Sequence, residues 1–211
     1  MPRVMCFGDS NTHGTPPLDV LGAPWQRMDA ATRWPVVMAA DLGPEWEVLE
    51  EGQPGRTTVH DDPIDGPHRN GLTVLPALLE SHAPLDLVLV MLGTNDLKMR
   101  FGVPAQDVAL ALGRIGRTIR ASGHAKAVML VCPPLPRAQG ALAAIYEGCE
   151  ARGQGLPAMV ERIADNDGFA FFDANVKVKV DPLDGVHFAP EAHVRLGRAL
   201  AQVVRSTFGA T

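Results

Sequence analysis

The sequence predicts an α/β protein built on a parallel sheet, because short apolar runs alternate with helical patterns along the chain. Five apolar runs are candidate strands, at residues 4–7, 47–51, 85–92, 127–132 and 169–172. Continuous apolar runs of this length are typical of strands that are buried on both faces. Strands that alternate with helices favour parallel pairing through right-handed crossovers.

The clearest helix is expected between the third and fourth runs, where four apolar residues form one stripe: Val108, Leu112, Ile115 and Ile119. Pro104 suits the first turn of this helix, and Gly123 lies just past its end. A similar stripe near the C-terminus consists of Ala192, Leu196, Ala199 and Val203. Residues 72–79 also have a helical pattern, but Pro76 within it predicts a kink or a late start.

Two long stretches have no regular pattern, at residues 11–33 and 56–69. Each follows the end of a predicted strand. Loops of this length are uncommon unless they are functional. In open α/β sheets, ligands bind beyond the carboxyl ends of the strands. We therefore expect the functional site at this edge.

Composition and charge restrict the possible classes. A chain of 211 residues with 46% hydrophobic residues fits one domain over residues 1–211. The net charge of −5, without a block of like charges, gives no footprint for nucleic acid. No apolar run approaches the roughly 20 residues of a membrane span. Asp9 interrupts the first apolar stretch too early for a secretory signal, so we expect a cytoplasmic protein.

The three cysteines are an odd number without C-x-x-C spacing, so neither a disulfide framework nor a zinc site is expected.

Four motifs that follow predicted strands carry groups used in acyl-transfer chemistry. Ser10 follows the first run, Gly52 the second and Asn95 the third, while Asp184 and His187 follow the fifth. Each motif alone is compatible with an ordinary turn or helix cap. Together they supply a nucleophile, two oxyanion donors and an acid–imidazole pair.

The spacing of the last motif suits a catalytic pair. Asp184 and His187 are three residues apart in a turn, so the carboxylate can accept from one ring nitrogen while the other faces a nucleophile. The backbone N–H groups of Ser10 and Gly52 and the Asn95 amide are candidate oxyanion donors. No third ligand lies at metal-binding spacing, so no metal is expected.

Other polar and aromatic residues near these motifs have secondary roles in this interpretation. His13 follows Ser10 closely but has no acidic neighbour at suitable spacing after it, so we expect it to line the site rather than act as base. Trp25 and Thr94 are further candidates for substrate contact. Asp9 is expected to fix the turn by accepting backbone N–H bonds.

Three further residues are expected to have structural roles. Arg56 is expected to cap local carbonyls or pair with an acid, with binding of a substrate carboxylate as the alternative. His193 is expected at the surface or in packing, and Trp34 in the core.

The four motifs in this order resemble the SGNH, or GDSL-type, hydrolase family, which is named for a Ser, Gly, Asn and His. These are Ser10, Gly52, Asn95 and His187 here. The resemblance extends from residue 4 to the last helix. It implies a three-layer, flavodoxin-like fold with strand order 2-1-3-4-5, and ester hydrolysis without a metal or other cofactor. Position 11 is Asn where the family's name gives Leu.

Residues 50–58 and 86–96 further resemble the bacterial arylesterase/acyltransferase branch, although that branch often has Trp at the position of His13. The resemblance implies hydrolysis of short-chain aryl or alkyl esters, and acyl transfer to alcohols. Some members of the branch are homo-oligomers whose neighbouring subunits wall the site. Residues 11–33 contain five apolar side chains that need a partner surface: Leu18, Val20, Leu21, Trp25 and Met28. We therefore expect a homo-oligomer that acts on a small-molecule ester.

Two alternatives stay open at this stage. The first is a carbohydrate acetyl esterase of the same family. The second, from a different class, is a non-catalytic flavodoxin-like binding module, since that fold also binds nucleotides and flavins. The first turn lacks a glycine-rich phosphate loop, which argues against the second alternative.

Overall fold

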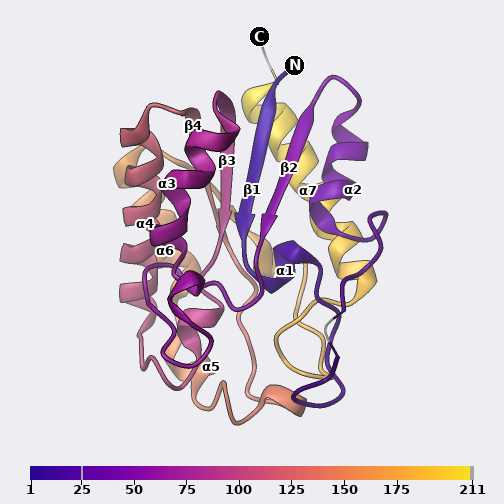
Figure 1. The fold of residues 1–211 in the computed structure, drawn as a ribbon, viewed down its shortest axis with the longest axis vertical. Helices are drawn as coiled ribbons and strands as arrows, with labels where there is room; N and C mark the ends of the chain where they lie inside the picture. The colour runs from indigo at the N-terminus through magenta and orange to yellow at the C-terminus, as the bar shows by residue number, and fades with distance from the viewer. Residues whose placement is uncertain (25, 210–211) are drawn as a thin grey trace.

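A computed structural model describes residues 1–24 and 26–209 (Figure 1). Five parallel strands form one sheet in the order β2-β1-β3-β4-β5, which confirms the expected topology. The strands are β1 (Arg3–Gly8), β2 (Glu47–Gly52), β3 (Leu85–Met91), β4 (Ala125–Cys132) and β5 (Ala170–Asp173). The fourth and fifth strands are therefore shifted slightly from their expected bounds.

Helices cover both faces of the sheet, which gives the expected three layers. The helices are α1 (Ser10–His13), α2 (Trp34–Leu42), α3 (Gly71–His82), α4 (Ala105–Ser122), α5 (Cys149–Arg152), α6 (Leu156–Asp167) and α7 (Pro190–Phe208). In Figure 1, α3, α4 and α6 lie on one side of the sheet, and α2 and α7 lie on the other.

Side chains alternate between two cores along each central strand. Met5 and Phe7 of β1 pack on the side of α3, α4 and α6, whereas Val4 and Cys6 pack on the side of α2 and α7. Trp34 is fully buried in the second core, as predicted. The alternation explains why these strands read as nearly continuous apolar runs, since both of their faces are buried.

Of the two outcomes predicted for Pro76, a kink or a late start, the late start is not observed. Helix α3 begins at Gly71 and contains Pro76 in its interior. The Asn70 side chain caps its first turn by accepting a hydrogen bond from the Thr73 N–H at 3.3 Å. Because this cap supports the first turn, the helix does not need Pro76 as its starting point.

The register of the sheet aligns the ends of three neighbouring strands. Gly8, the last residue of β1, pairs with Gly52 of β2 and with Met91 of β3. Ser10 follows this level by two residues, and Asn95 follows it by four. The parallel register therefore gathers three of the predicted motifs at one edge.

None of the helices within residues 1–24 and 26–209 combines the length and the apolar character that crossing a bilayer requires.

His193 of α7 is a packing residue, one of the two roles expected for it. Its ring is fully buried and lies 5.4 Å from the ring of Phe188. Neither ring nitrogen has a hydrogen-bond partner within the described part of the chain. Burial, followed by the charges of His187 and Arg33, lowers the pKa of His193 to about 4.

The buried imidazole predicts a loss of stability in acid. The folded state binds a proton on His193 less tightly than the unfolded state does. The contribution of the neutral His193 to the free energy of unfolding is therefore complete above about pH 6.5 and is lost as the pH falls toward 4. Between pH 7 and pH 5 the His193→Leu variant should lose about 2 kcal/mol less unfolding free energy than the wild type. Urea unfolding at both pH values measures this difference. Equal losses in the two proteins would contradict the prediction.

Candidate active site

Ser10 is the first residue of α1, immediately beyond β1, and Asp9 fixes the turn between them. The Asp9 carboxylate accepts a hydrogen bond from the Asn11 N–H at 3.0 Å, and its backbone carbonyl accepts one from the His13 N–H at 2.9 Å. This is the turn-fixing role that we expected for Asp9. Burial raises the pKa of Asp9 to about 6, although the bond from Asn11 works against the shift.

Gly52 allows the end of β2 to approach the backbone of α1. A Cβ atom at this position would lie 2.2 Å from the His13 nitrogen and 2.5 Å from the Thr12 carbonyl carbon. Backbone atoms cannot move aside as a flexible side chain can. The close packing of β2 against the turn that carries Ser10 therefore requires glycine at position 52.

Asn95 belongs to a short 3₁₀ helix, Asn95–Leu97, beyond β3. Its amide nitrogen donates to the Arg56 carbonyl at 3.0 Å and lies 3.4 Å from an Asp9 carboxylate oxygen. Its amide oxygen accepts a hydrogen bond from the Tyr146 hydroxyl at 3.2 Å. These contacts fix which way round the amide lies.

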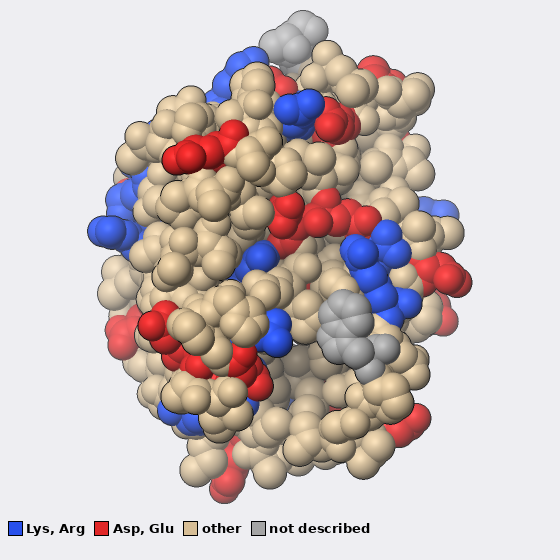
Figure 2. All heavy atoms as spheres, in the orientation of Figure 1, with Lys and Arg blue, Asp and Glu red and all other residues tan. Residues whose placement is uncertain are grey.

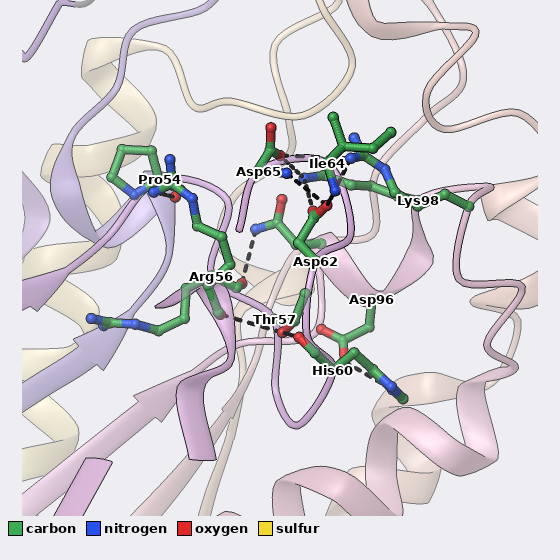
Figure 3. Close-up of polar contacts among 12 residues, drawn as sticks. Pro54, Arg56, Thr57, His60, Asp62, Ile64, Asp65, Asp96 and Lys98 are labelled. Carbon is green, nitrogen blue, oxygen red and sulfur yellow. Dashed lines mark hydrogen bonds and ion pairs between the residues drawn. The ribbon is translucent and has the colours of Figure 1, made fainter. Parts of the chain in front are cut away.

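Asp96, the next residue, ties the loop after β2 to the end of β3. Its buried carboxylate accepts from the Thr58 N–H at 3.1 Å and from the Thr58 hydroxyl. His60 lies beside it, with Nε2 3.7 Å from a carboxylate oxygen (Figure 3). Burial raises the pKa of Asp96, and the Thr58 hydrogen bonds oppose this shift.

Arg56 caps carbonyls, which is one of the roles expected for it. Its guanidinium donates to the Gly8 carbonyl at 2.8 Å and to the Glu51 carbonyl, and it lies 4.4 Å from the centre of the Phe7 ring. Only 4% of the residue is exposed. The Arg56 guanidinium therefore binds carbonyls at the ends of β1 and β2 rather than a substrate carboxylate.

Asp184 and His187 lie side by side in the loop before α7. The Asp184 Oδ2 and His187 Nδ1 atoms are 2.6 Å apart. The same oxygen accepts from the Leu18 N–H at 2.8 Å, and Oδ1 accepts from the N–H groups of Val186 and His187 at 2.9 Å. Burial alone raises the pKa of Asp184, but the hydrogen bond and charge of His187 outweigh it and lower the pKa overall. The carboxylate is thus kept ionised and faces the imidazole.

Asn11 holds the backbone on both sides of His187, a role that the sequence analysis missed. Its side-chain nitrogen donates to the Val186 carbonyl at 3.0 Å, and its oxygen accepts from the Phe188 N–H at 3.1 Å. The Asn at position 11 therefore connects the serine turn to the histidine loop. A leucine there makes neither bond.

Ser10, Asn95 and His187 line one cavity of about 310 Å³ at this edge. Figure 2 shows a hollow on this face, with charged side chains along its edge. The other lining residues include three apolar ones, Leu18, Leu142 and Ile145, and three with polar or charged groups, Tyr146, Arg69 and Lys98.

Two of the three predicted substrate contacts are not among the residues that line this cavity. His13 and Thr94 are buried and are not among the residues that line the cavity. The His13 ring lies 3.2 Å from the hydroxyl of Thr15, which does line it. Burial, followed by the charges of Arg27 and Arg33, lowers the pKa of His13 to about 4. Trp25 lies outside the described residues.

Gly52 and Asp184 are not among the lining residues either, but Asp184 contacts His187, which is. Within residues 1–24 and 26–209, the structure brings no three His, Cys, Asp or Glu side chains into an arrangement that could hold a metal ion.

Comparison with protein families gives a match over residues 6–195, to the family described as GDSL-like lipase/acylhydrolase. The matched range contains all four motifs. The chain belongs to this family. The SGNH resemblance of its sequence is thereby confirmed, and this hydrolase has the fold of the solved structures that it resembles.

Two solved structures illustrate the similarity. The native aryl esterase of M. smegmatis is 38% identical, with a TM-score of 0.92 over 98% of this chain and 99% of that one. A carbohydrate acetylesterase from Sinorhizobium meliloti is 35% identical, with a TM-score of 0.92 over 99% of this chain and 100% of that one. A comparison with curated proteins found no match.

Tyr146 is the second residue of this hydrolase that the sequence analysis missed. It is the chain's single tyrosine and only 2% exposed, and its ring lines the cavity. Burial raises its pKa well above the ordinary value, so the hydroxyl keeps its proton and donates to Asn95. A tyrosine far from every motif offers no sequence signal except its rarity here.

Replacing Tyr146 with Phe removes this hydrogen bond with little change of shape. If the hydroxyl holds the Asn95 amide in its catalytic orientation, kcat on an aryl acetate should fall by about 3- to 10-fold, with a smaller change in KM. Stopped-flow or steady-state kinetics give both constants, and circular dichroism checks the fold. A change confined to KM would show that Tyr146 only shapes the cavity.

Proposed function

We propose that this hydrolase is a serine esterase that cleaves short-chain aryl or alkyl esters through an acyl-enzyme on Ser10. One observation carries the proposal. His187 is held by Asp184 at 2.6 Å and lines the same cavity as Ser10 and Asn95. A serine, an oriented imidazole and an amide donor around one cavity are the groups that acyl transfer needs.

In the proposed reaction, the Ser10 Oγ attacks the ester carbonyl carbon while His187 takes its proton. Asp184 holds the imidazole tautomer and stabilises the imidazolium. The tetrahedral intermediate collapses as His187 returns the proton to the leaving alcohol. Water then attacks the acyl-enzyme with His187 again as base, which releases the acid and restores Ser10.

Three donors are proposed to stabilise the oxyanion. The Ser10 N–H belongs to the first turn of α1, where backbone donors have no acceptor within the helix. The Gly52 N–H lies at the aligned end of β2. One hydrogen of the Asn95 amide bonds to the Arg56 carbonyl, and the other makes only a long contact of 3.4 Å to Asp9, so this second hydrogen is proposed to donate to the oxyanion.

The size and lining of the cavity support a short acyl group. A volume of about 310 Å³ is at the lower end of the range for small-molecule sites. Similarity to an aryl esterase supports aryl esters, and similarity to a carbohydrate acetylesterase keeps an acetylated sugar as a second candidate. The polar wall made by Arg69, Lys98 and Asp65 favours this second candidate, because a sugar presents hydroxyl groups.

Removal of the proposed nucleophile and base tests the mechanism. Ser10→Ala and His187→Ala should each remove nearly all activity on an aryl acetate, and the double variant should be hardly slower, because these residues act as a unit. A fluorophosphonate probe should label the wild type at Ser10 and leave Ser10→Ala unlabelled. A non-catalytic binding module would not react.

The control for this experiment is Ser206→Ala, because Ser206 is an exposed residue of α7 whose hydroxyl donates to the Val203 carbonyl of the same helix. It should keep both activity and labelling. Retention of more than about a tenth of the wild-type kcat by either Ser10→Ala or His187→Ala would refute the assignment.

We also propose that the protein is a homo-oligomer whose neighbouring subunit completes the cavity mouth. Val20 and Leu21 are 60% and 61% exposed, and Leu21 lines the cavity. Ile64 and Met99 are 75% and 55% exposed and adjoin the lining residues Asp65 and Lys98 in sequence. Exposed apolar side chains on both sides of a mouth favour a covering surface.

A cytoplasmic location stays a prediction.

Oligomerisation should favour acyl transfer, because a covered mouth lowers the access of water to the acyl-enzyme. Light scattering at micromolar concentration should give a mass above that of one chain, and added alcohol should yield some new ester. Val20→Asp with Leu21→Asp should lower the mass and shift the product toward free acid. A monomeric wild type would contradict the first link, and an oligomer that yields only acid would contradict the second.

A further inference from the structure

One wall of the cavity carries more positive than negative charge. Arg69, Lys98 and Arg100 line it, and Asp65 is the only acidic side chain among the described residues that do so. The whole chain has a net charge of −5, so this wall opposes the overall balance. A local excess of one sign in a partly enclosed site attracts ligands of the other sign.

Lys98 and Arg100 share two nearby carboxylates, and Figure 3 shows Lys98 in one cluster with Asp62 and Asp65. Lys98 lies 3.6 Å from Asp62 and 3.4 Å from Asp65, while Arg100 lies 2.9 Å and 3.8 Å from the same two acids. Burial, followed by the charge of Arg100, lowers the pKa of Lys98 despite both carboxylates. The charges of Asp62 and Asp65 therefore balance those of Lys98 and Arg100, and no negative charge of this cluster is left to balance a third cation.

Arg69 is that third cation. Its guanidinium donates to the Pro54 carbonyl, and its buried Nε has no hydrogen-bond partner among residues 1–24 and 26–209. No carboxylate in this described part of the chain lies within ion-pair distance of it. A cavity wall that contains a guanidinium without an acid is suited to an anionic ligand, since Arg recognises carboxylates through paired N–H donors.

We propose that the cavity selects esters that also carry a free carboxylate, with the carboxylate at Arg69 and the ester carbonyl at Ser10. The inference rests on the proposed esterase function and names the class of its substrate. The carboxylate can belong to the acyl group, as in a half-ester of a dicarboxylic acid, or to the alcohol part, as in an acetylated hydroxybenzoate. Lys98 and Arg100 are paired with Asp62 and Asp65, so the net positive charge of this wall lies at Arg69.

Matched pairs of esters test the proposal. One pair is 4-nitrophenyl hydrogen succinate and its methyl ester, and the other is 3-acetoxybenzoate and its methyl ester. The ratio of kcat/KM between carboxylate and methyl ester is measured for the wild type and for Arg69→Gln. In at least one pair, the variant should lower the ratio by about tenfold. The pair that responds identifies the side of the ester that carries the anion.

Arg114→Gln is the control, because Arg114 is an exposed residue of α4 that does not line the cavity, and its loss changes the net charge equally. It should leave both ratios unchanged. A change of less than about twofold for Arg69→Gln in both pairs would overturn the proposal. An altered mass with unaltered ratios would also overturn it, since Arg69 would then pair with an acid of a second copy.

Calorimetry with succinate and with 3-hydroxybenzoate gives a readout without turnover. Tighter binding to the wild type than to Arg69→Gln supports the anion site even if no ester is hydrolysed, in which case the esterase proposal alone fails. Equal binding, or binding to neither protein, overturns the anion site whatever the activity.

Discussion

Three neighbouring strands, β2, β1 and β3, end at the same level, and the relative positions of Ser10, Gly52 and Asn95 depend on this alignment. Gly8, Gly52 and Met91 are neighbours across the ladder, so the segments that follow them leave the sheet from one line. The absence of a side chain at Gly52 then lets α1 pack on the end of β2. A shift of one residue in the β1–β3 pair would displace Asn95 from Ser10 by a strand step of about 3.3 Å, and the same shift in the β1–β2 pair would displace Gly52.

Around this edge, a second set of polar residues fixes the groups that would do the chemistry. Asn11 bonds the backbone before and after His187, Asp184 orients its ring, and Tyr146 fixes the amide of Asn95. Asp96 and Arg56 anchor the loop after β2 to the neighbouring strand ends. Preorganised donors cost little reorganisation when charge develops, which is why buried, hydrogen-bonded surroundings suit such a site.

Local motifs predicted much of this arrangement, and long-range contacts explain what they could not predict. The serine turn, the Asp184–His187 pair and the carbonyl-capping role of Arg56 each depend on residues close in sequence, or on a strand end that its apolar run indicates. Tyr146 lies 51 positions from Asn95, and Asn11 lies 175 from Val186. No periodicity connects such partners, because only the folded sheet brings them together.

The same limit applies to the helices. Helices α2 and α6 were not predicted, and α2 has too uniformly apolar a sequence to show a polar face. Helix α3 does not start late at Pro76, because the Asn70 side chain caps its first turn. Asn70 lies outside the apolar pattern from which the helix was inferred.

The hydrogen bond from the Leu18 N–H to Asp184 divides the long loop into two parts with different freedom. Its first part, up to residue 18, is hydrogen-bonded to the carboxylate that contacts His187, so a change in this part would also disturb the proposed base. Its tip carries the exposed Val20 and Leu21 at the cavity mouth and makes no such bond to the acid. Substrate range can therefore diverge among related sequences through the tip alone, while the root keeps the same chemistry. Grafting a loop between such enzymes should succeed when the junction follows residue 18 and fail when it precedes it.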